Sequence, residues 1–416
     1  MRALAAALAI GTAAFLVARC GASSAKPQAA NAPDTEVRAG VAKTLAARAA
    51  AILRRDKAAY LATDAPGSGT WRTNDAARFD SLMAVPLSAW TLRLDAQPTK
   101  VPHMYQIHQS YEVSGVDPLP VNSTEYLSFV PQGSAWLVSS DSDGTTFGQR
   151  SDVQIWDQGP VSVVHGARSL VIGLGGDERL KSYADLADHG AAKAGKIWAA
   201  AGWHGTVVVE VPMSQPQVEA LLNEQPGSLQ NVAAITAGEG GKPMTSAPAS
   251  RVLVNPDAWA TLAPDSWQVV MDHELTHVAT RTWNTAATPI WLSEGAADYS
   301  GFLGSGFPLS RMLKDLDAAA RQPGFDAGVL PTESDFQGAN ADIAYQESNL
   351  ACRLIAEKYG QAKLVAFYKA VGTASTSTTA GSTADPVDQA FHSILGTSTK
   401  DFTAKWKQYV LTMARS

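Results

Sequence analysis

Two histidines four residues apart, His273 and His277, enclose Glu274 in the sequence HELTH (residues 273–277). On an α-helix, residues four apart project from one face, roughly 6 Å from each other. Their imidazole nitrogens can therefore reach one zinc ion at about 2.0–2.1 Å each. Glu274 follows the first histidine directly, so its carboxylate lies beside the metal, where it can take a proton from a water molecule on the ion. The run predicts a catalytic metal site.

A coincidental surface helix is the alternative interpretation of this run. With 8 histidines in 416 residues, an accidental match has a chance on the order of one per cent. A catalytic zinc ion also needs a third protein ligand and an open fourth position for water. Glu294 follows His277 by 17 residues, in a second helical pattern over residues 289–302. We expect it to project toward the first helix as the third ligand.

Asp298 lies four residues after Glu294, on the same face of the second predicted helix. It is placed to accept the outer N–H of one zinc-binding histidine, which we expect to be His273. Carboxylates in this position fix the tautomer and the ring orientation of a metal ligand. The alternative for both carboxylates is a solvated helix face. Their spacing after the zinc motif and a short loop favours the ligand interpretation.

These residues resemble the gluzincin metallopeptidases, the thermolysin-like clan. The stretch PIWLSEGAADY (residues 289–299) is similar to the peptidase MA-like domain of exported actinobacterial proteins, and residues 345–360 are similar to a helix of that family. The resemblance is specific over about residues 251–360 and loose over the rest of 156–416, and it does not cover the N-terminal part. It implies a gluzincin-like fold that holds one Zn²⁺ per chain.

The resemblance also assigns roles to individual residues. It implies that His273, His277 and Glu294 bind the zinc ion, that Glu274 is the general base and acid, and that Asp298 orients a histidine. A Tyr or His donor usually stabilises the oxyanion of peptide hydrolysis alongside the metal. Tyr345 is our candidate, because it starts a helix that the family places near the zinc. For Tyr299 we expect a packing role, and for His392 an exposed position.

Composition excludes several other classes of protein. The chain has 33 basic and 39 acidic residues, a formal charge of −6 and no long Lys/Arg run, so we expect no nucleic-acid partner. Two cysteines cannot form a disulfide framework. Hydrophobic residues make up 45% of the chain, enough for packed cores. The length suggests two or three domains.

Residues 1–25 have the build of an export signal, with Arg2 before an apolar run that ends in small residues. Ser23 and Ala25 fit cleavage after Ala25. Lipidation at Cys20 is the alternative, although Arg19 stands where a lipobox has a small residue. We therefore expect an exported protein, either secreted or associated with the cell envelope, whose one possible membrane anchor is Cys20. Residues 26–33 have the composition of a flexible linker.

The remaining chain predicts an α+β protein in two parts. In residues 34–152, helices over 35–60 and 75–83 precede several alternating strands, an element order that resembles the cone-shaped NTF2-like domains. Residues 153–416 would form the peptidase MA-like domain, β-rich at first and helical from about residue 266. Within it we expect a hairpin over 161–173 and further elements at 177–199 (helix), 206–211 (strand), 214–222 (helix), 251–255 (strand) and 373–384 (loop).

The motifs therefore predict an exported zinc metallopeptidase acting on peptides or proteins, with Glu274 as general base and acid. An alternative is a cell-envelope binding or scaffold protein with a structural or latent zinc site. An intact Glu274 argues against that alternative, because a structural site needs no base. A third possibility is that the N-terminal part binds a ligand or partner and regulates the protease. Substrate specificity and oligomeric state are open.

Overall fold

The computed structural model describes residues 32–414 except 98, 204, 239–248, 339 and 375–384. The predicted export signal, Cys20, and most of the predicted linker and of the 373–384 loop lie outside the described residues. Within the described ranges, no helix has the length and hydropathy needed to cross a membrane. Helices and strands are both abundant, in agreement with the predicted α+β class.

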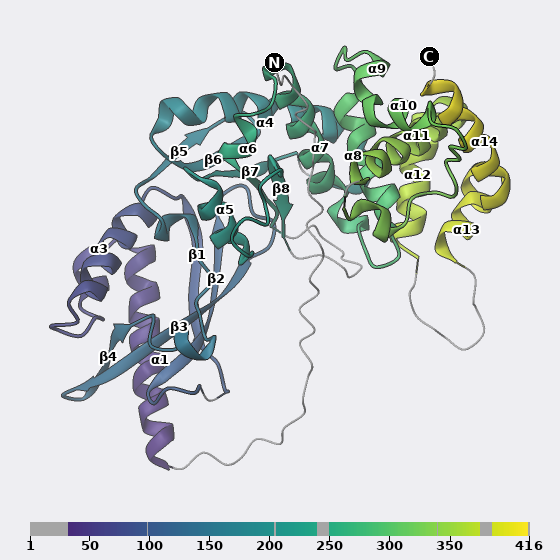
Figure 1. The fold of residues 1–416 in the computed structure, drawn as a ribbon. Coiled ribbons are helices and arrows are strands. Elements are labelled where there is room, and N and C mark those ends of the chain that lie inside the picture. Colours follow the sequence, from purple (N-terminus) through teal and green to yellow (C-terminus); the bar gives the residue numbers. More distant parts are fainter. Residues whose placement is uncertain are drawn as a thin grey trace.

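The N-terminal part consists of three helices followed by a four-stranded antiparallel sheet (Figure 1). Val41 and Leu45 of the first helix pack on sheet residues such as Ile107, Leu127 and Val138 in a buried cluster. The predicted alternation of buried and less buried residues holds over residues 105–113, whereas residues 127–129 are buried in succession. The elements are α1 (Ala32–Leu53), α2 (Lys57–Leu61), α3 (Thr70–Leu82), β1 (Leu87–Leu94), β2 (Met104–Val113), β3 (Val121–Gln132) and β4 (Ala135–Ser140).

The single helix predicted over residues 35–60 is wrong. The first helix ends at Leu53, and Arg55 just after it adopts a positive φ of 56°. Asp56 then caps α2, because its carboxylate accepts a hydrogen bond from the amide of Ala59 at 2.9 Å. The second predicted helix, over 75–83, begins five residues earlier, at Thr70. The break turns the chain so that α1, α2 and α3 pack together around a buried arginine, Arg48, which forms ion pairs with Asp64 and Asp75.

A second sheet has the strand order β5-β6-β7-β9-β8. The three inner strands are parallel, and the two edge strands are antiparallel to their neighbours. The sequence did not predict β8, which has only four residues. The elements of this part are β5 (Val161–His165), β6 (Ser169–Leu174), α4 (Asp177–Ile197), β7 (Val207–Val211), α5 (Gln215–Leu222), β8 (Ala234–Ala237), β9 (Arg251–Val254) and α6 (Pro256–Trp259).

Both faces of this second sheet are buried, as expected for inner parallel strands. Val171 and Val209 face the cluster shared with α4 and α7. Leu170 and Ile172 face the opposite way, into a cluster that includes Trp90 of the N-terminal part. A buried ion pair also joins the two parts, since Arg251 of β9 donates to both carboxylate oxygens of Asp117 at 2.6 and 2.7 Å. The domain limit at residues 152 and 153 stays a prediction.

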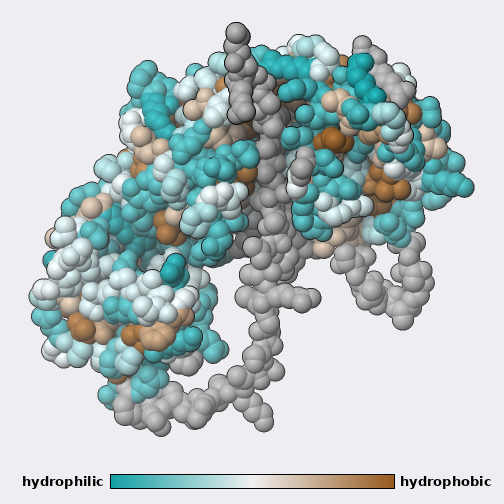
Figure 2. All heavy atoms as spheres, in the orientation of Figure 1, coloured by the Kyte–Doolittle hydropathy of each residue, from teal (hydrophilic) through white to brown (hydrophobic). Residues whose placement is uncertain are grey.

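The rest of the described chain is helical and lies beside the second sheet (Figure 1). On the face drawn in Figure 2, the described residues are mainly hydrophilic and the hydrophobic ones form small separate groups. The long helix α7 packs against α4, β8 and α8. The helices are α7 (Trp267–Thr280), α8 (Ile290–Phe302), α9 (Leu309–Met312), α10 (Lys314–Ala320), α11 (Ala341–Tyr359), α12 (Gln361–Gly372), α13 (Pro386–Ala390) and α14 (Thr399–Met413).

Candidate metal centre

The helix α7 carries the HELTH sequence and is buried along almost its whole length. Its apolar residues Val270, Leu275, Val278 and Ala279 are all buried. Asp272, directly before the first histidine, accepts from the ammonium of Lys193 on α4 at 2.7 Å. The helix is therefore held on its flank by α4, and its other side is free to face α8.

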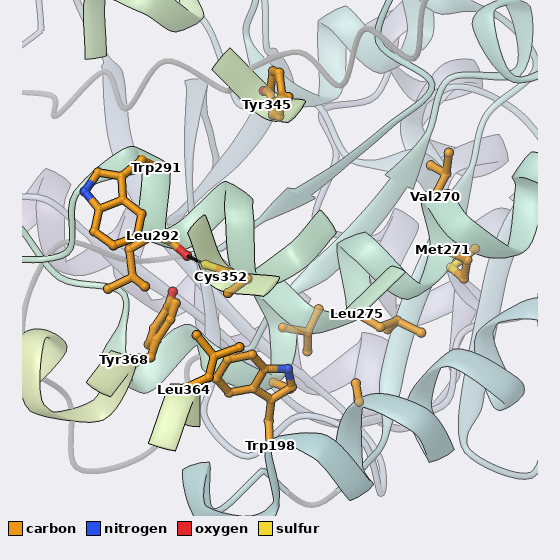
Figure 3. Packing of buried hydrophobic residues seen from close by; sticks show 14 of the residues in the cluster. Trp198, Val270, Met271, Leu275, Trp291, Leu292, Tyr345, Cys352, Leu364 and Tyr368 are labelled. Carbon is orange, nitrogen blue, oxygen red and sulfur yellow. Dashed lines mark hydrogen bonds between the residues drawn. The ribbon is translucent and has the colours of Figure 1, made fainter. Parts of the chain in front are cut away.

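Two glycines let α8 lie unusually close to its neighbours. A Cβ at Gly301 would stand 2.9 Å from the carbonyl oxygen of Val269 on α7, and one at Gly295 would stand 2.3 Å from that of Ser348 on α11. Figure 3 shows the second contact region, where Cys352 of α11 lies against Leu292. Cys352 is buried there. The close approach of α8 brings its carboxylates within reach of α7.

His273, His277 and Glu294 present one ligand atom each to a common point, as the motif predicted. The Nε2 atoms of the two histidines lie 3.0 Å apart, and Glu294 Oε2 lies 3.3 Å from His273 Nε2 and 3.4 Å from His277 Nε2. Ligands of a tetrahedral zinc ion at about 2.0–2.1 Å are about 3.3 Å apart. The three donors therefore fit such an ion, which uses both nitrogen and oxygen ligands.

Asp298 contacts the outer nitrogen of His273, as predicted, with Oδ1 at 2.8 Å from Nδ1. With the N–H of Nδ1 directed at this carboxylate, Nε2 is the ring nitrogen that can bind a metal. Burial lowers the pKa of His273, but the hydrogen bonds to Asp298 and Glu294 outweigh it and raise the pKa to about 10. Burial raises the pKa of Glu294, yet the two histidines hold it well below its ordinary value.

Exposure is unequal around the three donors. The side chain of His273 is fully buried, whereas those of His277 and Glu294 each keep 13% of their surface exposed. Solvent thus reaches the donors from the side of His277 and Glu294. A catalytic zinc site needs such an accessible side, because its fourth position holds water or substrate.

Glu274 is not one of the three donors, but its carboxylate is close enough to interact electrostatically with His273. Its carboxylate Oε2 accepts a hydrogen bond from the hydroxyl of Thr236 at 2.7 Å. Thr236 belongs to β8, the edge strand that the sequence did not predict. Glu274 is buried, with only 2% of the residue exposed. Because little water reaches its carboxylate, the hydroxyl of Thr236 contributes directly to the orientation of that group.

Tyr345 lies within α11 rather than at its start, because the helix begins four residues earlier, at Ala341. Its ring packs edge-on against Phe336, and its hydroxyl makes no hydrogen bond within the described residues. Burial, reinforced by the carboxylates of Glu294 and Asp298, raises the pKa of Tyr345 well above its ordinary value. The phenol therefore keeps its proton and can act as a donor. Its oxyanion role stays a prediction.

Sequence reasoning missed two residues of this neighbourhood. Thr236 gave no signal, because it is 38 positions from Glu274 and lies on a very short strand. Arg281 gave only a weak signal: it follows His277 by four residues, a spacing that places it on the same face of a helix. The structure buries Arg281 to 4% exposure, and its Nη2 donates to the carbonyl of Thr236 at 3.1 Å. Tyr299 packs against the core, and His392 is exposed, both as predicted.

Comparison with known proteins adds no family to this description. A scan against protein-family models finds no match, and a search of curated proteins finds no similar sequence. The gluzincin resemblance therefore depends on the motif residues themselves.

Proposed function

We propose that this protein is an exported zinc metallopeptidase that hydrolyses peptide bonds in peptide or protein substrates. The observation that carries the proposal is the convergence of His273, His277 and Glu294 on one point, with Glu274 beside them. Structural zinc sites are almost always closed by four protein ligands. Three donors, two of them partly exposed, are typical of a catalytic site instead.

His273, His277 and Glu294 would hold a zinc ion, which would supply a Lewis acid for the scissile carbonyl and for the acidity of the attacking water. The residues of the chain supply the rest. Asp298 holds His273 in the tautomer whose Nε2 faces the ion. The carboxylate of Glu274 takes the proton of the attacking water and delivers it to the leaving amine. The hydroxyl of Tyr345 is our candidate donor to the oxyanion.

The alternative is a cell-envelope binding or scaffold protein with a structural or latent zinc site. It predicts that removal of zinc unfolds the protein and that no peptide is cleaved. Glu274 favours the enzyme, because a scaffold has no use for a carboxylate beside its metal ligands. The third possibility is that the N-terminal part regulates the protein; it would act through the contact with the second sheet that contains the buried ion pair of Asp117 and Arg251.

The experiment compares cleavage of a peptide library by the mature protein and by Glu274→Gln, with and without chelator. We expect one zinc per chain in both proteins, and cleavage by the wild type that chelator abolishes and added zinc restores. Loss of the general base lowers the rate by about 10²–10⁴-fold. Glu178→Gln, at an exposed site on α4, is the matched control. Stoichiometric zinc without cleavage by the wild type would favour the scaffold.

A further inference from the structure

We infer that Thr236 is a positioning residue that holds the carboxylate of Glu274 in its working orientation, an inference that rests on the proposed function. The hydroxyl oxygen of Thr236 lies 2.7 Å from Glu274 Oε2 and 2.9 Å from the backbone oxygen of the same residue. One side chain thus contacts both the helix α7 and the functional group of its base. No other side-chain hydrogen bond to this carboxylate occurs among the described residues.

Thr236 is itself fixed from two sides. Along the ladder it pairs with Val252 of β9. On the opposite edge of β8, its carbonyl oxygen accepts from the guanidinium of Arg281 at 3.1 Å. Arg281 is almost completely buried and forms no ion pair with a carboxylate in the described part of the chain. Its side-chain hydrogen bond among the described residues goes to this carbonyl, and its charge also interacts with the carboxylate of Glu274. Arg281 therefore supports β8 from the side of the base.

The consequence for Glu274 follows from its freedom of rotation. A glutamate has three side-chain torsions, and its terminal torsion is broad, so packing alone orients the carboxylate poorly. A hydrogen bond to a carboxylate is among the stronger ones. With Oε2 held by a β-branched residue whose own χ1 is restricted, Oε1 is left for proton transfer. Displacement of a reacting group by about 1 Å can cost about 100-fold in rate.

The test uses two substitutions that separate the hydroxyl from the shape of the side chain. Thr236→Val is nearly isosteric and removes the donor, whereas Thr236→Ser keeps it. Thr91→Val, at an exposed position on β1, is the control for the substitution itself. For Thr236→Val we expect one zinc per chain, an unchanged KM and a kcat lowered about 10–100-fold. Thr236→Ser should retain a kcat near that of the wild type.

Crystal structures of the zinc-loaded variants give a second result that does not depend on activity. We expect the Glu274 carboxylate to stay in place in Thr236→Ser and to move or adopt several conformers in Thr236→Val. An unmoved carboxylate in Thr236→Val, an unchanged kcat, or equal loss in both variants would overturn the inference. Absence of peptide cleavage by the wild type would count against the proposed function alone. The position of the Glu274 carboxylate in the variant structures would still decide whether Thr236 holds it. If Thr236→Val disturbs the fold, Thr236→Ala provides a second test, because it removes the hydroxyl without putting a methyl group in its place. It should show the same displaced carboxylate and the same lower kcat.

Discussion

Asp298 Oδ1 lies 2.8 Å from His273 Nδ1, one helical turn beyond Glu294 on the same helix. One face of α8 therefore contributes both a donor that could bind a metal, Glu294, and the acceptor that orients a second such donor, His273. The contact between Asp298 and His273 is positioned by two helices and not by a loop, because α7 and α8 pack directly against each other at the site. A rigid arrangement of this kind favours tight and selective metal binding.

Asp298→Ala should weaken zinc binding without abolishing it. The substitution frees the imidazole of His273 to rotate and removes the acceptor that raises its basicity, and such changes typically cost 10–100-fold in metal affinity. Asp298→Asn keeps an acceptor oxygen and should lose less. Competition with a chromogenic chelator measures the affinity, with Asp80→Ala, an exposed aspartate, as control. Equal zinc affinity in Asp298→Ala and the wild type would contradict the assigned role.

Gly295→Ala should destabilise the protein, although alanine in a helix interior is normally about 1 kcal/mol more stable than glycine. The new Cβ would lie 2.3 Å from the carbonyl oxygen of Ser348, so α8 and α11 must separate. Overpacking of this kind costs about 1–3 kcal/mol. Chemical denaturation measures the change in the free energy of unfolding.

Gly195→Ala on α4 is the matched control, because nothing lies within 4 Å of its added Cβ. It should stabilise the protein by about 0.5–1 kcal/mol. The opposite signs of the two effects distinguish close helix packing from helix propensity. A stabilising Gly295→Ala would show that α8 and α11 do not pack as tightly as described.

Glu347 provides a pH-dependent test of the helical part. Burial, with a smaller contribution from Asp335, raises the pKa of Glu347 to about 8. Because this pKa is above its unfolded value, the folded protein binds the extra proton, and stability falls as the pH rises from about 4.5 to 8. Glu347→Gln removes this loss. The backbone oxygen of Glu347 still accepts from Trp406 in the variant.

We therefore expect Glu347→Gln and the wild type to be equally stable at pH 4 and to diverge above it. One pKa unit corresponds to about 1.4 kcal/mol, so the variant should gain on the order of 2–3 kcal/mol at pH 8, after allowance for solvent near the half-buried carboxyl. Denaturation of both proteins across this range, at equal zinc, gives the difference at each pH. A constant difference would contradict the raised pKa.

The sequence could predict the convergence of the three candidate metal donors because helical geometry fixes them locally. His273 and His277 share a face by their spacing alone, and so do Glu294 and Asp298. Thr236 could not be predicted, since its contact with Glu274 depends on where β8 lies in the sheet. The break in the first helix was missed because Arg55 takes a positive φ, a conformation that usually signals itself through glycine.

The most direct test of the central claim is zinc K-edge X-ray absorption on the full-length mature protein, together with its metal content. The account predicts one zinc per chain, bound by the nitrogens of His273 and His277 and a carboxylate oxygen of Glu294 at about 2.0–2.2 Å, with one further light-atom ligand from solvent. His273→Ala should lose the ion. A protein purified without zinc that binds none when zinc is added, or an ion with a fourth ligand from the protein, would contradict it.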